Sequence, residues 1–206
     1  MYKRIITYLM LAALLAGCGL PMTAGVGTLS GSGKMATRDY AIEGFTGIDA
    51  KNGFNVTVTG GDKFKVAVTA DDNVLDALSV RKAGDTLQLG VDSSKAQSVH
   101  TTRLEAAITM PELKGVSLDS GSRLTVAEPA PVGTTLKLTQ KAGSHSDLSA
   151  MTVQTADVAL YAGSSAAISV TDRLDYQLYA GSQLRYTGNP TIGTSKTLAG
   201  STATQY

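Results

Sequence analysis

Charged side chains in the second half of this 206-residue chain have the types needed for catalysis or ligand binding. An acid, two cations and an imidazole follow one another at Asp119, Arg123, Lys141 and His145. A polysaccharide lyase or hydrolase needs two carboxylates, or acids close to a metal and a base. Even with Asp147 as a neighbour, the set contains no clear carboxylate pair. A solvated sheet surface with cross-strand charge pairs is the simpler interpretation.

Two tyrosines extend this set. Tyr161 and Tyr179 are candidates for a stacked aromatic platform that holds a sugar ring. The alternative is that they cover the surface of a sheet, and the chain has no Trp, the strongest aromatic side chain for sugar binding. We define the candidate face as Asp119, Arg123, Lys141, His145, Tyr161 and Tyr179.

Other site chemistries lack a recognisable pattern. His100 and His145 are the two histidines, and neither has a second ligand at metal-site spacing. Asp71-Asp72-Asn73 and Asp92 could suggest calcium, but they lack the ligand spacing of a calcium loop and suit turn capping. We therefore expect no catalytic residue, no cofactor and no metal. Without residues 1–17 the chain keeps 16 basic and 17 acidic residues, a balance that excludes a nucleic-acid partner.

The sole cysteine, Cys18, carries the most specific chemistry. Lys3 and Arg4 precede an apolar run that is shorter than the roughly 20 residues a membrane-spanning helix needs. This pattern is typical of a secretory signal segment, predicted here as residues 1–17. Leu15-Ala16-Gly17-Cys18 resembles the lipobox of bacterial lipoproteins, in which cleavage precedes the cysteine and acyl chains such as palmitate are attached. A free structural cysteine is the alternative. Gly19, where Asp would retain the protein in the inner membrane, favours the outer membrane.

A Gly-Ser repeat indicates which elements position these residues. The glycines follow one another at steps of 22, 20, 18 and 19 residues. The pairs are Gly121-Ser122, Gly143-Ser144, Gly163-Ser164, Gly181-Ser182 and Gly200-Ser201. A fixed period near twenty residues is typical of a chain that stacks similar units. Around each glycine, odd offsets are mostly apolar and even offsets mostly polar, which is the alternation of β-strands.

The predicted fold is therefore all-β, a parallel β-helix or β-solenoid in which each Gly-Ser pair bends the chain between strands. Stacked coils bring the serines about 4.8 Å apart, close enough for a hydrogen-bonded column of hydroxyl groups. An antiparallel sandwich with Gly-Ser turns is the alternative.

The first half also predicts strands. We expect strands at 55–59 and 63–69 joined by a Gly-Gly-Asp turn, then at 86–91 and 103–110, with a helical turn at 73–78 and a polar loop at 93–102. The predicted organisation is a signal at 1–17, the lipidated Cys18 with a flexible tether at 18–38, and one β-domain at 39–206.

Several segments resemble the head GIN domain family of bacterial envelope proteins. They are Gly44-Phe-Thr-Gly-Ile-Asp-Ala-Lys-Asn-Gly-Phe-Asn-Val-Thr-Val58, Ile108-Thr-Met-Pro-Glu-Leu113, Leu118-Asp-Ser-Gly-Ser122 and the Gly-Ser repeats, across most of 39–206. The resemblance implies a β-solenoid with an adhesin-like role and no catalytic residues.

The sequence thus predicts a non-enzymatic, lipid-anchored protein of the bacterial cell envelope. Its expected partners are the membrane, through the lipid, and an envelope protein, a surface polysaccharide or a second copy of itself. The alternatives are a polysaccharide-active β-helix enzyme, which would use the candidate face, and a self-assembling structural protein of the envelope.

Overall fold

The fold is all-β, as the alternating sequence predicts. The structure, a computed structural model, describes residues 27–101 and 103–206. The predicted signal and Cys18 lie outside these residues. A 15-stranded sheet holds most strands, and β1 (Thr28–Ser30) pairs with β8 (Ser98–His100). Among the described residues the one helical turn is η1 (Leu75–Ala77), inside the predicted range 73–78, and no helix is long and apolar enough to cross a bilayer.

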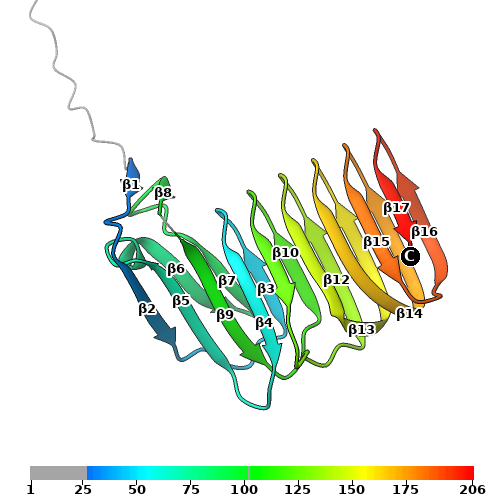
Figure 1. The fold of residues 1–206 in the computed structure, drawn as a ribbon, viewed down its shortest axis with the longest axis horizontal. Coiled ribbons are helices and arrows are strands. Elements are labelled where there is room, and N and C mark those ends of the chain that lie inside the picture. Colours follow the sequence, from blue (N-terminus) through cyan, green and yellow to red (C-terminus); the bar gives the residue numbers. More distant parts are fainter. Residues whose placement is uncertain (1–26, 102) are drawn as a thin grey trace, which may run out of the picture.

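The second half consists of strands that pair in parallel with the strand one repeat later. These strands are β10 (Gly115–Leu118), β11 (Arg123–Val126), β12 (Thr135–Gln140), β13 (His145–Leu160), β14 (Ser165–Leu178), β15 (Gln183–Thr187), β16 (Thr191–Thr197) and β17 (Thr202–Gln205). The pairing joins His145 to Ser165 and Ser165 to Gln183, which is the step of the Gly-Ser repeat. Figure 1 shows the strands side by side along the long axis of the molecule.

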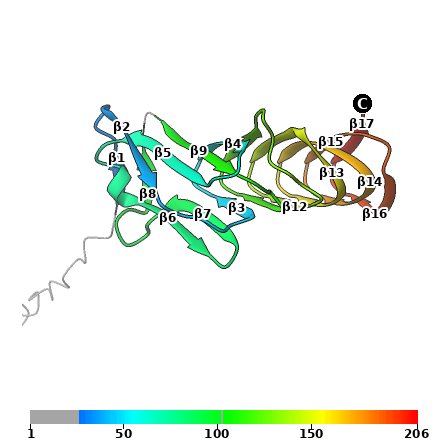
Figure 2. The same cartoon turned by 90° about the horizontal axis from the view of Figure 1, so that it is seen from below.

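Each Gly-Ser turn separates two parallel ladders. Before the turns, the pre-turn ladder contains β10, β12, the end of β13, the end of β14, and β16. After the turns, the post-turn ladder contains β11, the starts of β13 and β14, β15 and β17. The two ladders form layers on either side of a buried interior (Figure 2).

The predicted bends are tight turns with two successive positive φ angles. In the turn that joins β13 to β14, Ala162 has φ 52° and Gly163 has φ 71°. Such pairs define type I′ turns, whose twist suits flanking strands. A Cβ atom on Gly163 would meet no atom within 4 Å, so glycine is needed for the backbone angle rather than for space. Its N–H donates to the carbonyl oxygen of Ala180, at 2.9 Å, so the stack continues through the turns.

The serine hydroxyl groups do not form the expected hydrogen-bonded column. The serines do lie one above another, and Ser144, Ser164 and Ser182 are buried. However, the Ser164 hydroxyl donates to the carbonyl oxygen of Tyr161 in its own turn, at 2.7 Å. Ser144, Ser182 and Ser201 do the same at 2.7–2.8 Å. A carbonyl three residues back is the nearest acceptor, so the hydroxyl closes its own turn.

A further turn of the same kind lies in the first half. Asn52 has φ 63° and Gly53 has φ 77°, between β3 (Gly47–Ala50) and β4 (Asn55–Gly60). β3 pairs with β10 and β4 with β11, so this unit extends both ladders. The repeat search missed it because Phe54 replaces the serine and a long insertion separates it from Gly121.

That insertion extends each layer with further strands, of which β7 and β9 pair in parallel with β3 and β4. The inserted strands are β5 (Lys65–Asp71), β6 (Leu78–Ala83), β7 (Thr86–Val91) and β9 (Leu104–Met110), and β2 (Met35–Tyr40), which precedes the first turn, pairs antiparallel with β5. The predicted strands are confirmed, but their expected hairpin is wrong, because β9 lies between β4 and β5. A parallel β4–β9 pair lets Val58 and Ile108 bury side by side.

Two loop expectations in this region are also corrected. Residues 35–38, placed in the tether, belong to β2, which pairs with β5. The polar loop at 93–102 contains β8, which pairs with β1. Both segments are mostly polar and exposed, so their sequences lack the alternation that marks the inner strands.

One hydrophobic core runs through the molecule from Phe45 to Leu184. Inward positions carry the apolar residues of the alternating pattern, and Leu118, Leu124 and Leu138 are almost wholly buried. Because apolar burial stabilises by about 25 cal/mol per Å², this column of side chains fixes the register of both ladders. Outward positions are therefore held at defined places on the surface.

Candidate functional site

The post-turn ladder arranges part of the candidate face in one column. Arg123 pairs with His145, which pairs with Ser165. The column continues through Gln183 to Thr202. These residues lie two positions after each turn glycine and point outward, as the alternation predicts. Adjacent members are about 4.8 Å apart along the stack.

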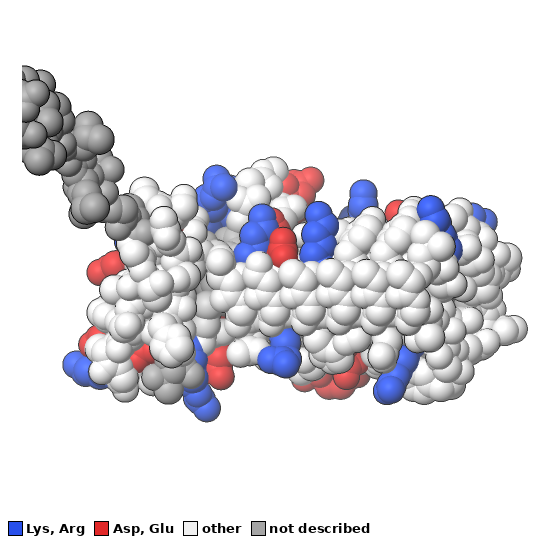
Figure 3. Space-filling model, turned by 90° about the horizontal axis from the view of Figure 1, so that it is seen from above, with Lys and Arg blue, Asp and Glu red and all other residues white. Residues whose placement is uncertain are grey.

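The other candidate residues lie in a separate column on the pre-turn ladder. Asp119, Lys141, Tyr161 and Tyr179 each directly follow a residue of that ladder's register, so they align with one another. The turns stand between the two columns. Figure 3 shows a regular uncharged band, the exposed Ala-Gly turn edge, with charged side chains on both sides. The structure therefore divides the candidate face into two surfaces.

The two tyrosines stack on each other. The ring centroids of Tyr161 and Tyr179 are 5.1 Å apart, and the ring planes differ by 1°. The ammonium group of Lys196 lies 5.3 Å from the Tyr179 centroid, and the Tyr179 hydroxyl donates to Gln177 at 3.2 Å. Ring faces are thus occupied by a neighbouring ring and a cation. This geometry suits a covering of the sheet better than an open platform for sugar.

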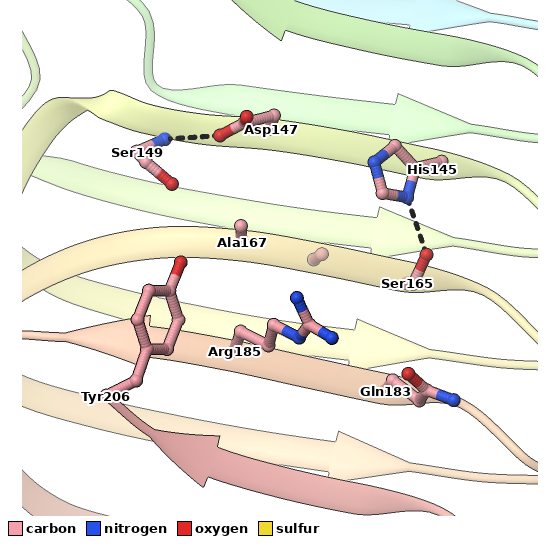
Figure 4. A pocket seen from close by; sticks show the side chains of 9 residues that line it. His145, Asp147, Ser149, Ser165, Ala167, Gln183, Arg185 and Tyr206 are labelled. Atoms are coloured by element: carbon pink, nitrogen blue, oxygen red, sulfur yellow. Dashed lines mark hydrogen bonds between the residues drawn. The ribbon is translucent and has the colours of Figure 1, made fainter.

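A hollow lies on the post-turn ladder and takes in one residue of the candidate face, His145. It has a volume of about 330 Å³ and is lined by residues of β13, β14 and β15 together with Tyr206. In Figure 4 the side chains of His145, Arg185 and Tyr206 surround the small side chain of Ala167. Asp147 and Ser165 also line the hollow.

A second outward column creates this hollow. Asp147 pairs with Ala167, and Ala167 pairs with Arg185. The methyl group of Ala167 therefore leaves a gap between a carboxylate and a guanidinium group. The column of Asp147, Ala167 and Arg185 lies four residues after each turn glycine. It was not predicted, because the predicted columns lie two residues before or after each glycine. The alternation would have identified it, because even offsets point outward throughout the repeat.

Hydrogen bonds orient two groups at the rim. His145 Nδ1 lies 2.6 Å from the Ser165 hydroxyl oxygen, which leaves Nε2 available on the outer side of the ring. An Asp147 carboxylate oxygen accepts the Ser149 N–H at 3.1 Å. The Arg185 side chain has no hydrogen bond or ion pair within the described part of the chain. A guanidinium group without a protein partner is suited to binding an anion.

The hollow does not have the features of a catalytic or metal site. Among residues 27–101 and 103–206, no three His, Cys, Asp or Glu residues form a group that could hold a metal ion. A retaining or inverting glycosidase needs two carboxylates across the bond that it cleaves, and Asp147 is the one carboxylate in the lining. The arrangement can bind and orient a polar ligand.

The carboxyl groups whose pKa is shifted lie outside the hollow. The Arg173 guanidinium, followed by the backbone N–H of Thr194, holds the pKa of Asp175 below its usual range. Hydrogen bonds from Ser32 and from Ser94 lower the pKa of Asp72 and of Asp92, respectively. These three aspartates stabilise turns and strand edges, since each bonds groups close to its own strand or loop.

Comparison with known families supports the resemblance over part of the chain. Residues 44–134 match the model of the family described as "Putative auto-transporter adhesin, head GIN domain". The match includes the first tight turn and the turn at Gly121, and it ends before the later Gly-Ser pairs. The family model thus covers less than the expected range of 39–206. No curated protein matches the chain.

Solved structures are similar in fold. The crystal structure of a putative adhesin from Bacteroides fragilis is 18% identical, with a TM-score of 0.56, and the alignment covers 86% of this chain and 100% of that one. A putative lipid binding protein from Parabacteroides distasonis is 14% identical, with a TM-score of 0.48, and the alignment covers 87% and 99%. At 18% identity, the first likeness shows a similar fold and nothing further.

Proposed function

We propose that this chain, whose residues 44–134 belong to the head GIN domain family, is a non-enzymatic envelope protein that binds a partner through its stacked strands. We interpret its two parallel ladders as a β-solenoid, closed at each repeat by a tight turn. The adhesin-like names of the family and of the Bacteroides structure support a binding role in general terms. The proposed partner is a surface polysaccharide or another envelope protein.

The observation that carries this proposal is the in-register exposure of polar side chains on the post-turn ladder. His145, Ser165 and Gln183 form one outward column, and the neighbouring column places Asp147 and Arg185 beside it. A rigid strand fixes the spacing of such groups before a partner arrives, which lowers the entropy lost on binding. The surface has polar groups at repeated intervals and suits a partner with repeated polar units.

Lipid attachment at Cys18 is the second part of the proposal. Several acyl chains give stable anchoring, because each buried methylene group contributes about 0.8 kcal/mol. We expect labelled palmitate to be incorporated into the chain and the protein to fractionate with outer membranes. The Cys18→Ala variant should lose the label and appear in the soluble fraction. Equal labelling of the variant would contradict this attachment site.

Binding is tested in intact cells. Photo-crosslinking groups placed at Gln183 on the post-turn ladder should capture a partner, whereas groups placed at Asp62, an exposed residue in the turn that follows β4, should not. Equal capture at both positions would contradict a role for the ladder. A polysaccharide screen tests the enzymatic alternative, since turnover that is lost in Asp119→Ala would overturn the non-enzymatic proposal.

A further inference from the structure

We propose that the hollow over Ala167 binds a sugar residue that carries a carboxylate, as in a uronic acid polymer. This inference rests on the proposed binding function and identifies its ligand class. The hollow lies between Asp147 on β13 and Arg185 on β15, with β14 as its floor. Asp147 and Arg185 are two strand spacings apart, about 9.6 Å at 4.8 Å per strand.

The cation at one end selects for an anion. Arg185 is exposed, has no side-chain partner in the described residues, and in Figure 4 directs its guanidinium group toward the middle of the hollow. Guanidinium groups bind carboxylates through two parallel N–H···O bonds. A second hollow, lined by Gln183, Thr202 and Thr204, borders Arg185 on its other side. The cation is therefore accessible from both sides.

The other rim groups are suited to hydroxyl groups. Asp147 retains lone pairs beyond its bond from Ser149, and His145 presents Nε2 because Nδ1 faces Ser165. Carboxylates and imidazoles accept or donate hydrogen bonds to hydroxyl groups. Acceptors at one end and a cation at the other match a ring with hydroxyl groups on one side and a carboxylate on the other.

The surroundings favour a saccharide over an apolar peptide. Besides the rim groups already named and two alanines, the lining side chains carry hydroxyl or amide groups, and none is a large aliphatic side chain. Tyr206, 64% exposed, directs its hydroxyl end toward Ala167 and adds an aromatic ring to the lining. The second hollow extends this surface along the stack, so there is room for the next sugar residues of a polymer beside the first.

Histidine resonances of the unmodified full chain give the first test. His100 and His145 are the two histidines, and His100 lies on β8, away from the hollow. Titration with oligogalacturonate should shift the His145 ring resonances and leave those of His100 unchanged. A neutral galacto-oligosaccharide of the same length should cause a much smaller shift. The absence of an acidic-ligand effect at His145, or equal shifts at both histidines, would overturn the inference.

Variants give the second test. Arg185→Gln should weaken oligogalacturonate binding by about tenfold or more, since it removes a charge-assisted hydrogen bond. Ala167→Gln, which fills the hollow and keeps every polar rim group, should weaken it similarly. Arg81→Gln is the matched control, because Arg81 is an exposed arginine on β6, outside the hollow and outside both outward columns. Equal weakening by Arg81→Gln would indicate general charge attraction and overturn the site.

The same variants separate this inference from the proposed function. One outcome is that no variant, nor the unmodified chain, binds acidic saccharides, while the Arg185→Gln variant with a crosslinking group at position 183 still captures its cellular partner. The proposed ligand class is then wrong and the binding role stands. If the unmodified chain neither crosslinks nor binds saccharide, both proposals fail.

Discussion

The serine of the first four Gly-Ser turns is buried, and the bonding of its hydroxyl group differs between turns. Ser164 donates to the Tyr161 carbonyl oxygen at 2.7 Å, while the Ser122 hydroxyl has no partner in the described part of the chain. Both side chains are fully buried. The two serines therefore occupy equivalent places in the repeat and differ in one hydrogen bond.

This difference predicts unequal effects of the same substitution. Ser164→Ala should lower the free energy of unfolding by about 1 kcal/mol, the usual net value of one hydrogen bond. Ser122→Ala should be neutral or stabilising, because it removes a buried polar atom without a partner. Urea denaturation of the two variants measures both values. Equal losses would show that the turn bond contributes nothing specific.

At the scale of elements, the alternating pattern predicted the strands well but not their partners. Val56, Val58, Val66 and Val68 alternate as expected, and the structure buries all four. Pairing of β9 between β4 and β5 depends on residues far apart in sequence, which local alternation cannot specify. The stack of the second half was predictable because its repeat reveals which strands share a register.

The candidate site was predictable to a smaller extent. Outward positions such as His145 followed from the alternation. The division of the candidate face by the turn edge depends on the direction of each layer, which alternation leaves open. The hollow depends on Ala167 being smaller than its neighbours above and below, a feature visible only once the register joins Asp147, Ala167 and Arg185.

One polar pair lies inside the stack where other repeats have apolar residues. Gln140 and Ser146 are fully buried. With its oxygen toward Ser146, the Gln140 amide lies 2.5 Å from the hydroxyl oxygen, and its nitrogen donates to the Ser165 carbonyl oxygen at 2.9 Å. The next repeat has Leu160 and Ala166 at the equivalent positions.

Removing one member of this pair should lower the free energy of unfolding more than replacing both members with apolar residues. Gln140→Leu should destabilise the fold by about 1–3 kcal/mol, because the Ser146 hydroxyl loses its partner. The double variant Gln140→Leu/Ser146→Ala has the same residue types as the next repeat at these two positions and should recover most of that loss. Thermal and urea unfolding of the single and double variants measure the coupling. A double variant as unstable as the single one would contradict the explanation.

A bulge between β14 and β16 depends on an ionised carboxylate. Asp175 faces both Gly193 and Thr194, accepts the Thr194 N–H at 2.6 Å, and accepts two bonds from Arg173. A Cβ atom on Gly193 would meet the ends of the Arg173 and Asp175 side chains, so a larger residue there would displace this ion pair.

This bulge predicts a pH dependence. The pKa of Asp175 is lowered in the folded state, so its contribution to stability is present above the pKa of an unfolded aspartate and is lost as the pH falls through the folded value. Asp175→Asn should lower the Tm at neutral pH, and the difference from the unmodified chain should vanish in strong acid. Asp62→Asn, at an exposed turn, is the control. A difference that persists unchanged at low pH would contradict this role.

Across the whole molecule, burial decreases toward the last strands. The buried core ends at Leu184, and β16 and β17 have mostly exposed residues and pair on one side within the described chain. Local opening is easiest where few apolar contacts hold hydrogen-bonded strands. Stability should therefore differ along the stack even though parallel pairing continues to its last strands.

Hydrogen exchange tests this gradient. Amides of 191–205 should exchange well before those of β10 and β11, although Leu198 and Thr202 donate 2.9 Å backbone bonds to the preceding coil. Mass spectrometry of peptides from both regions measures the rates. Equal protection in the two regions would indicate a single cooperative unit.

The insertion that separates the first tight turn from the second has a consequence for biogenesis. Ile48 can pair with Val116, and Val56 with Leu124, only after the ribosome has synthesised the intervening strands. At about 5–20 residues per second, translation leaves these apolar edges without their neighbours for several seconds. Unpaired flat edges invite association with other chains. A nascent chain of this design therefore benefits from an escort that shields β3 and β4 until the later half arrives.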